Sequence, residues 1–222
     1  METTREVPHE IVEEKSAAAD AGSAERVPVS LDDYLANYAA QHYEYVEGVL
    51  VEMSPASLIH NNLIYYVFAL LNAYFELTQS GQVVGQPFVM RLPAFPERRR
   101  EPDLMVILNG NTGTLTPTAM DGAPDIVIEI VSDESVTRDY GEKFEEYEKG
   151  GVPEYWLIDP IRQDAVFFRR GEKVYARHSA DADGHYESPA LPGLRVHVPT
   201  LWADKLPGPA ATARAVAAML NR

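Results

Sequence analysis

The sequence predicts a mixed α/β fold in which helices cover the faces of one central β-sheet. Three short apolar runs, at residues 103–108, 125–131 and 154–158, have the length and residue types of buried strands. The second run is nearly continuous in β-branched residues, which is typical of a strand buried on both faces. Segments of helical periodicity precede, separate and follow these runs, so the pattern favours a sheet with helices packed on it.

The N-terminal part of the ordered chain is predicted to be a helix followed by a hairpin. Ser30 is a good N-cap, and Asp32 and Asp33 place negative charge in the first turn of a helix that extends to about residue 40. Residues 43–53 alternate apolar and polar side chains around Glu47-Gly48, which indicates a hairpin turn.

A long helix is predicted over residues 58–77, and extended segments follow it. Gly81 ends the helix, residues 82–92 are extended, and a loop rich in Pro and Arg leads to the strand at 103–108. The apolar side chains that recur at helical spacing in this helix are Leu63, Tyr66, Val67, Leu70, Leu71, Tyr74 and Phe75.

The second half of the chain continues the alternation of strands and helices. A turn-rich connector at 109–122 precedes the strand at 125–131, and a helix at 140–149 is ended by Gly150-Gly151. Further elements follow, namely strands near 165–169, 173–177 and 193–198 and an Ala-rich helix at 210–220. We expect one domain at 28–205, a disordered acidic tail at 1–27 and a helical tail at 206–222.

Composition restricts the class of protein. The apolar share of 45% in 222 residues is enough for one sizeable core. The absence of cysteine excludes disulfides and thiolate chemistry, so any metal must be held by oxygen or histidine. The chain has no long apolar run, no signal-peptide pattern, and neither of the glycine-rich phosphate-binding motifs. We therefore expect a soluble cytoplasmic protein that does not interact with a membrane.

The formal charge of −15 argues against tight nonspecific binding of nucleic acid. Residues 1–27 carry seven acidic and three basic side chains, so most of the excess acid lies outside this tail. The one tight basic cluster is Arg98-Arg99-Arg100, with a lesser cluster at Arg169-Arg170 and Lys173. A local basic patch and a metal ion could still bring a phosphate to an acidic protein.

Two carboxylates on neighbouring apolar strands are the most informative side chains. Asp103 follows Pro102 at the start of one strand, and Glu129 lies four residues into the next. A buried charge costs several kcal/mol unless a cation or strong hydrogen bonds compensate it. Mg²⁺ prefers carboxylates, carbonyls and water, so the backbone carbonyl of Ile130 is a candidate third ligand.

Lys143 would complete a site for phosphate-ester chemistry. It lies fourteen residues after Glu129, in the first turn of the following helix, where its ammonium could fold back over the strand end. Each residue also has an ordinary interpretation: a capping Asp103, a structurally paired Glu129, and an exposed pair between Asp139 and Lys143. Their joint occurrence favours the functional interpretation.

Residues 124–135 (PDIVIEIVSDES) and 138–160 (RDYGEKFEEYEKGGVPEYWLIDP) strongly resemble the Uma-two family of restriction endonucleases, a branch of the PD-(D/E)XK nuclease superfamily. An earlier segment of the family pattern is matched by residues 43–49, Ser54-Pro55 and His60. The resemblance covers about residues 30–200, and its motifs are specific jointly and weak singly.

The resemblance implies a restriction-endonuclease-like sheet and assigns roles to five residues. Asp103 and Glu129 match the metal-binding aspartate and glutamate, and Lys143 matches the catalytic lysine. The superfamily usually has this lysine two residues after the glutamate, where this chain has valine. Glu44 and His60 match a glutamate and a histidine near the site, although an exposed strand residue and a helix cap are their ordinary interpretations. Ser132 and Tyr147 also fit the family run, as supporting rather than catalytic residues.

The function that follows is metal-dependent cleavage of DNA phosphodiester bonds with Mg²⁺ or Mn²⁺, by a homodimer if analogy with the superfamily holds. Two alternatives stay open. One is a catalytically silent interaction module on a nuclease scaffold, which the acidic composition favours. The other is a hydrolase of RNA or of small phosphoesters.

Overall fold

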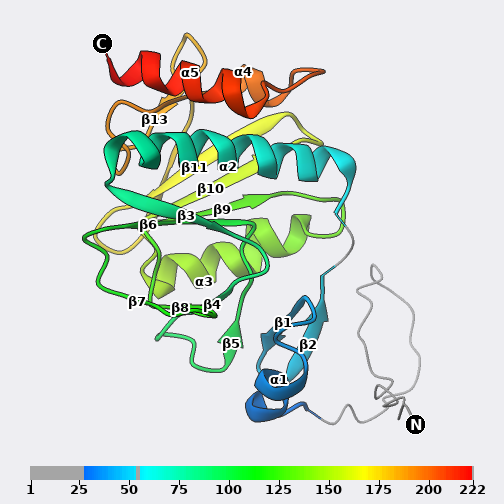
Figure 1. The fold of residues 1–222 in the computed structure, drawn as a ribbon. Coiled ribbons are helices and arrows are strands. Elements are labelled where there is room, and N and C mark those ends of the chain that lie inside the picture. Colours follow the sequence, from blue (N-terminus) through cyan, green and yellow to red (C-terminus); the bar gives the residue numbers. More distant parts are fainter. Residues whose placement is uncertain (1–27, 54–55, 222) are drawn as a thin grey trace, which may run out of the picture.

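A central six-stranded sheet organises the protein, in a computed structural model that describes residues 28–53 and 56–221 (Figure 1). The strand order is β12-β11-β10-β9-β6-β3. The parallel pair β9 and β10 lies among antiparallel neighbours, so the sheet is mixed, as predicted. The strands are β3 (Gly81–Gly85), β6 (Leu104–Leu108), β9 (Ile126–Ile130), β10 (Glu154–Asp159), β11 (Asp164–Arg170) and β12 (Tyr175–His178).

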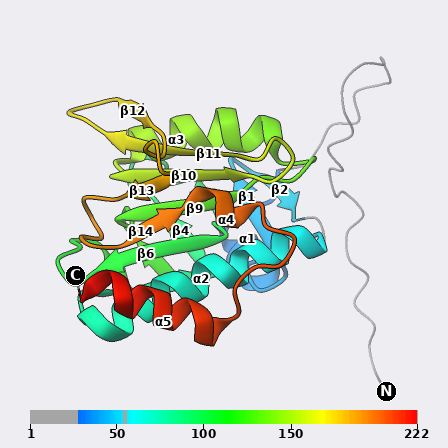
Figure 2. The same ribbon diagram turned by 90° about the horizontal axis from the view of Figure 1, so that it is seen from above.

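Helices cover both faces of this sheet (Figures 1 and 2). Helices α2 (Leu58–Thr78) and α5 (Pro209–Leu220) lie on one face, and α3 (Lys143–Gly150) lies on the other. The side chains of β9 alternate between two cores: Ile128 packs toward α2, whereas Val127 packs toward α3. The predicted fold class is confirmed.

Helix α2 forms where the sequence predicts it and ends one residue later. The Ser57 hydroxyl caps its first turn by accepting the backbone N–H of His60 at 3.1 Å. All seven apolar side chains predicted to share one face of this helix are buried against the sheet. Helix α5 packs on α2 through Val216, which is fully buried, so the C-terminal helix shares the core of the domain.

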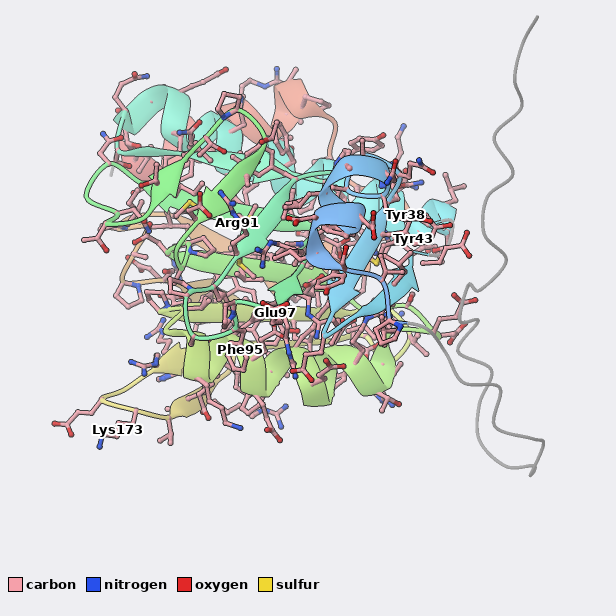
Figure 3. The ribbon with its side chains drawn as sticks, turned by 90° about the horizontal axis from the view of Figure 1, so that it is seen from below. Tyr38, Tyr43, Arg91, Phe95, Glu97 and Lys173 are labelled. Atoms are coloured by element: carbon pink, nitrogen blue, oxygen red, sulfur yellow. The ribbon has the colours of Figure 1, made fainter. Side chains whose placement is uncertain are left out.

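A small unit at the N-terminal end has its own tyrosine-rich core. It contains α1 (Leu31–Asn37), β1 (Tyr43–Val46), β2 (Val49–Glu52) and β5 (Arg98–Arg99), the strands pairing in the order β2-β1-β5. Ser30 caps α1 and the hairpin turns at Glu47-Gly48, both as predicted. The ring centroids of Tyr38 and Tyr43 are 5.9 Å apart. Figure 3 shows the two side chains close together in this unit.

The remaining elements form two further small sheets. One has the order β4 (Val89–Arg91), β8 (Ala119–Asp121), β7 (Thr114–Leu115), so the predicted connector contains two short strands. The other pairs β13 (His185–Glu187) with β14 (Arg195–His197), and α4 (Val198–Leu201) follows it. The predicted acidic tail at 1–27 lies outside the described residues. Among the described helices, none combines the length and apolarity needed to cross a membrane.

Candidate functional site

The site lies where the end of β9 meets the beginning of β6. Because these strands are antiparallel and Leu104 pairs with Ile128, Asp103 and Glu129 are brought together from opposite chain directions. Asp103 Oδ2 accepts the backbone N–H of Ile130 at 2.6 Å, and its own N–H points to Glu129 Oε2 at 3.4 Å. Each acidic residue is only 3% exposed. The Ile130 amide thus contacts Asp103, and the metal contact of the Ile130 carbonyl stays a prediction.

The Lys143 side chain extends to this pair from the first residue of α3. Its Nζ lies 2.8 Å from Glu129 Oε1, 3.4 Å from Glu44 Oε1 and 3.6 Å from Asp139 Oδ1. The alternative of an exposed surface pair with Asp139 is wrong, because both residues are buried. Burial alone would lower the pKa of Lys143, but the three carboxylates raise it above its ordinary value.

A π-helical turn places Lys143 over the strand end. Residues 138–142 (Arg138–Glu142) form this turn directly before α3, so the helix begins at the lysine itself. Such turns often occur at functional positions. One helical turn further on, the Tyr147 hydroxyl donates to Glu129 Oε1 at 2.8 Å, so Glu129 has two donors on one oxygen. Ser132 and Ser135 cap the loop before the turn through mutual hydrogen bonds.

His60 joins the site from the first turn of α2. Its Nε2 lies 3.2 Å from Asp103 Oδ2, whereas its Nδ1 is buried without a hydrogen-bond partner among the described residues. Burial lowers the pKa of His60, but Asp103 outweighs this effect and leaves the pKa raised. The interpretation of His60 as a helix cap alone is therefore wrong, since the side chain faces a carboxylate of the site. Ser54 and Pro55, which belong to the same motif, lie outside the described residues.

Glu44 is fully buried rather than an exposed strand residue. Burial raises its pKa, but Lys143, Arg100 and Arg138 lower it to about 2. The Arg100 guanidinium donates to Glu44 Oε2 at 2.9 Å and to Glu146 Oε2 at 2.8 Å. Glu44 thus connects Lys143 to a second buried cation.

The basic run at 98–100 is an internal network instead of an exposed patch. Arg100 is 1% exposed and Arg99 is 7% exposed. Arg98 pairs with Glu47 at 2.7 Å and with Glu146 at 2.9 Å. These arginines bind carboxylates and carbonyls of the protein, so they do not offer the phosphate-binding surface that their sequence indicates.

Three further residues at the site carry little signal in the sequence. The Gln86 amide donates to Asp103 Oδ1 at 2.8 Å and to the backbone oxygen of Glu101 at 3.1 Å. Glu101 is 1% exposed, and within the described part of the chain neither of its carboxylate oxygens has a hydrogen-bond partner. Asp139 adds a buried carboxylate beside Lys143. Only the i,i+4 spacing of Asp139 and Lys143 could have been found beforehand.

We expect Glu101 to make stability depend on pH. Burial and then Glu44 raise the pKa of Glu101 to about 7 from 4.5, against a smaller lowering by Lys143. The folded protein then binds more protons than the unfolded chain between these values, so this stabilising contribution is complete below pH 4.5 and is lost as the pH rises to 7. Relative to Glu101→Gln, the free energy of unfolding should fall on the order of 3 kcal/mol over this range.

Urea unfolding of the wild type and Glu101→Gln with a chelator present, at pH 4.5 and 7.5, measures this difference. The exposed Glu97→Gln variant controls for the change of net charge. A constant difference between wild type and Glu101→Gln at both pH values would contradict the prediction.

The donor set fits a hard divalent cation. Asp103 and Glu129 provide carboxylate oxygens, the ligands that hard divalent cations prefer, and the His60 ring lies beside Asp103. Burial raises the pKa of Glu129, with Asp103, Asp139 and Glu44 acting in the same direction and Lys143 opposing them. Across residues 28–53 and 56–221, no three His, Asp or Glu side chains are already arranged to hold a metal ion. Mg²⁺ commonly uses one or two carboxylates and water, which this pair could supply.

Comparison with known proteins agrees with the geometry. A search of solved structures finds a crystal structure titled as a putative nuclease belonging to DUF820 from Anabaena variabilis ATCC 29413, with a TM-score of 0.65 and 18% identity over 79% of this chain and 98% of the other. At this identity the likeness shows the fold. Curated proteins give no significant match. Residues 31–199 match the family profile Uma2, described as "Putative restriction endonuclease". Because the match spans most of the sequence, the chain belongs to the Uma2 family, and this membership supports a nuclease function.

Proposed function

We propose that this protein is a metal-dependent endonuclease that hydrolyses DNA phosphodiester bonds with Mg²⁺ or Mn²⁺. The observation that carries the proposal is the convergence of Asp103, Glu129 and Lys143 at one buried point. Two acidic groups and one ammonium in this arrangement match the needs of phosphodiester hydrolysis, in which a cation holds the phosphate and a positive group offsets the charge that develops on it.

Asp103 and Glu129 would hold the cation. When bound, a divalent metal polarises the phosphodiester and makes a nearby water more acidic. The hydrogen bonds from Ile130 N–H and Gln86 fix the orientation of the Asp103 carboxylate, and Tyr147 fixes that of Glu129. These donors pre-organise the two acidic groups before substrate arrives.

Lys143 acts as a permanent cation in this proposal. Its raised pKa keeps the proton on Nζ, so it serves as a donor to phosphoryl oxygens and not as a base. Glu44 provides a second carboxylate, 3.4 Å from the ammonium, that helps to position it. His60 offsets the charge of Asp103 through its 3.2 Å contact.

Cleavage of supercoiled plasmid with Mg²⁺ or Mn²⁺ tests the proposal. We expect Asp103→Asn and Glu129→Gln to reduce the nicking rate by about 100-fold or more and to weaken Mn²⁺ binding in calorimetry, because each removes one of the few negative ligands. Glu97→Gln is the matched control, since its side chain is exposed. Nicking at the wild-type rate by both acid variants would refute the assignment.

The silent interaction module remains the second candidate, and the charge of −15 together with the fully ion-paired lysine supports it. Mn²⁺ binding without nicking of plasmid, single-stranded DNA or RNA would favour this alternative. Cleavage of RNA or of a small phosphodiester alone would identify a different substrate.

We also propose a homodimer, because cutting both strands of a duplex requires two sites. Light scattering measures the oligomeric state directly.

A further inference from the structure

The buried carboxylate of Glu101 lies beside the site described above. Glu101 lies in the segment that leads into β6, and only 1% of it is exposed. Both of its carboxylate oxygens lack a hydrogen-bond partner within residues 28–53 and 56–221. Buried carboxylates are almost always satisfied, so an unsatisfied one needs a physical reason such as an ion.

The groups around Glu101 show where such an ion would lie. Its backbone N–H donates to Glu44 Oε1 at 3.1 Å, and its backbone oxygen accepts from Gln86, so the main chain is fixed while the side chain is not. Lys143 is already contacted by Glu129, Glu44 and Asp139. No described cation therefore neutralises Glu101 at hydrogen-bonding distance.

His42 provides the second ligand. Its Nδ1 lies 3.8 Å from Glu101 Oε2, which is too long for a hydrogen bond. Two ligands that each lie roughly 2.1 Å from one ion can be at most about 4.2 Å apart, so this separation suits a shared cation. The His42 side chain is 56% exposed and gives the position an open side for water ligands.

We propose that Glu101 and His42 bind a first-row divalent cation, with Mn²⁺ as the probe, at a position distinct from the Asp103–Glu129 pair. One carboxylate oxygen and one imidazole nitrogen form a ligand set that Mn²⁺ and Zn²⁺ accept more readily than Mg²⁺ does. The binding also neutralises a carboxylate that burial makes costly. This inference stands on the Glu101 and His42 geometry and does not require the chain to be a nuclease.

Counting bound Mn²⁺ by calorimetry and electron paramagnetic resonance at pH 7.5 tests the second position. We expect two ions per wild-type chain, one ion in Glu101→Gln and in His42→Ala, and one in Asp103→Asn. The ion retained in Asp103→Asn should be lost in Asp103→Asn/His42→Ala. Matched controls are Glu97→Gln and His178→Ala, which change the same residue types elsewhere and should bind two ions.

The outcomes separate this inference from the proposed function. The second position alone would be overturned if the wild type bound one ion, if Asp103→Asn removed that ion, and if neither Glu101→Gln nor His42→Ala weakened its binding. One ion that only the Glu101 and His42 variants remove would support it while removing the support for a metal at Asp103. Because His42 is exposed, His42→Ala is expected to fold normally even if Glu101→Gln does not. A decrease of less than tenfold in the Mn²⁺ affinity of His42→Ala at the second position would refute the inference.

Discussion

Replacing Arg100 with methionine is expected to lower the free energy of unfolding by about 3–5 kcal/mol, because it removes the buried cation that Glu44 and Glu146 share, with their ion pairs to Lys143 and Arg98 left in place. The Arg100 side chain is 1% exposed, and those of Glu44 and Glu146 are 0% and 2% exposed. Methionine keeps much of the volume but offers no donor to these carboxylates. The loss therefore comes from electrostatics and desolvation more than from a cavity.

Chemical denaturation at pH 7 measures the effect, with Arg162→Met as the control. Arg162 also pairs with a buried carboxylate, that of Asp159, but its side chain is 55% exposed, so its loss should cost about 1 kcal/mol or less. The second variant Arg100→Met/Glu146→Gln removes one of the two buried carboxylates that lose Arg100 and should recover part of the stability. Equal stability of Arg100→Met and wild type would show that the network contributes nothing net.

The arginine run shows why part of the site could not be predicted. Three consecutive arginines in a Pro-rich loop indicate an exposed basic patch by composition, since buried arginines are rare. Their true environment depends on the glutamates of α3 and of the N-terminal hairpin, which lie more than 40 residues away in the sequence. Short-range pattern carries no information about such pairings. The same applies to Gln86, which reaches Asp103 across 17 residues.

The fold and the acidic pair, by contrast, are visible in the sequence. The inner strands β6, β9 and β10 consist mainly of apolar residues, and the long helix has a clear 3.6-residue period, so their types were predictable and most boundaries lie within two residues. Asp103 and Glu129 stand out because they interrupt or border such runs. Lys143 stands out less, because the π-helical turn that aims it at Glu129 has no sequence signature of its own.

Lys143→Met is expected to reduce the turnover of the proposed nuclease by about 10²–10³-fold while leaving Mn²⁺ binding intact, because it removes the charge that would stabilise the transition state. The methionine side chain has a similar length and fits a buried position. Losing the ammonium beside Glu129 makes the acidic cluster more negative, so Mn²⁺ affinity should stay the same or rise. A fall in kcat without a rise in the metal Kd is a result that a purely structural role would not give.

Lys149→Met is the matched control, since Lys149 lies on the same helix with its side chain 61% exposed and pairs with Glu145. The pH profile gives an independent check on the role of Lys143. Burial opposes protonation of its amine, but Glu129, Glu44 and Asp139 raise the pKa above the ordinary value of 10.5. Lys143 therefore stays protonated at neutral and mildly alkaline pH. We expect no decrease of kcat from its deprotonation below pH 10. Wild-type turnover by Lys143→Met, or a fall in wild-type kcat near pH 8 that Lys143→Met abolishes, would show that the ammonium does not act as the permanent cation.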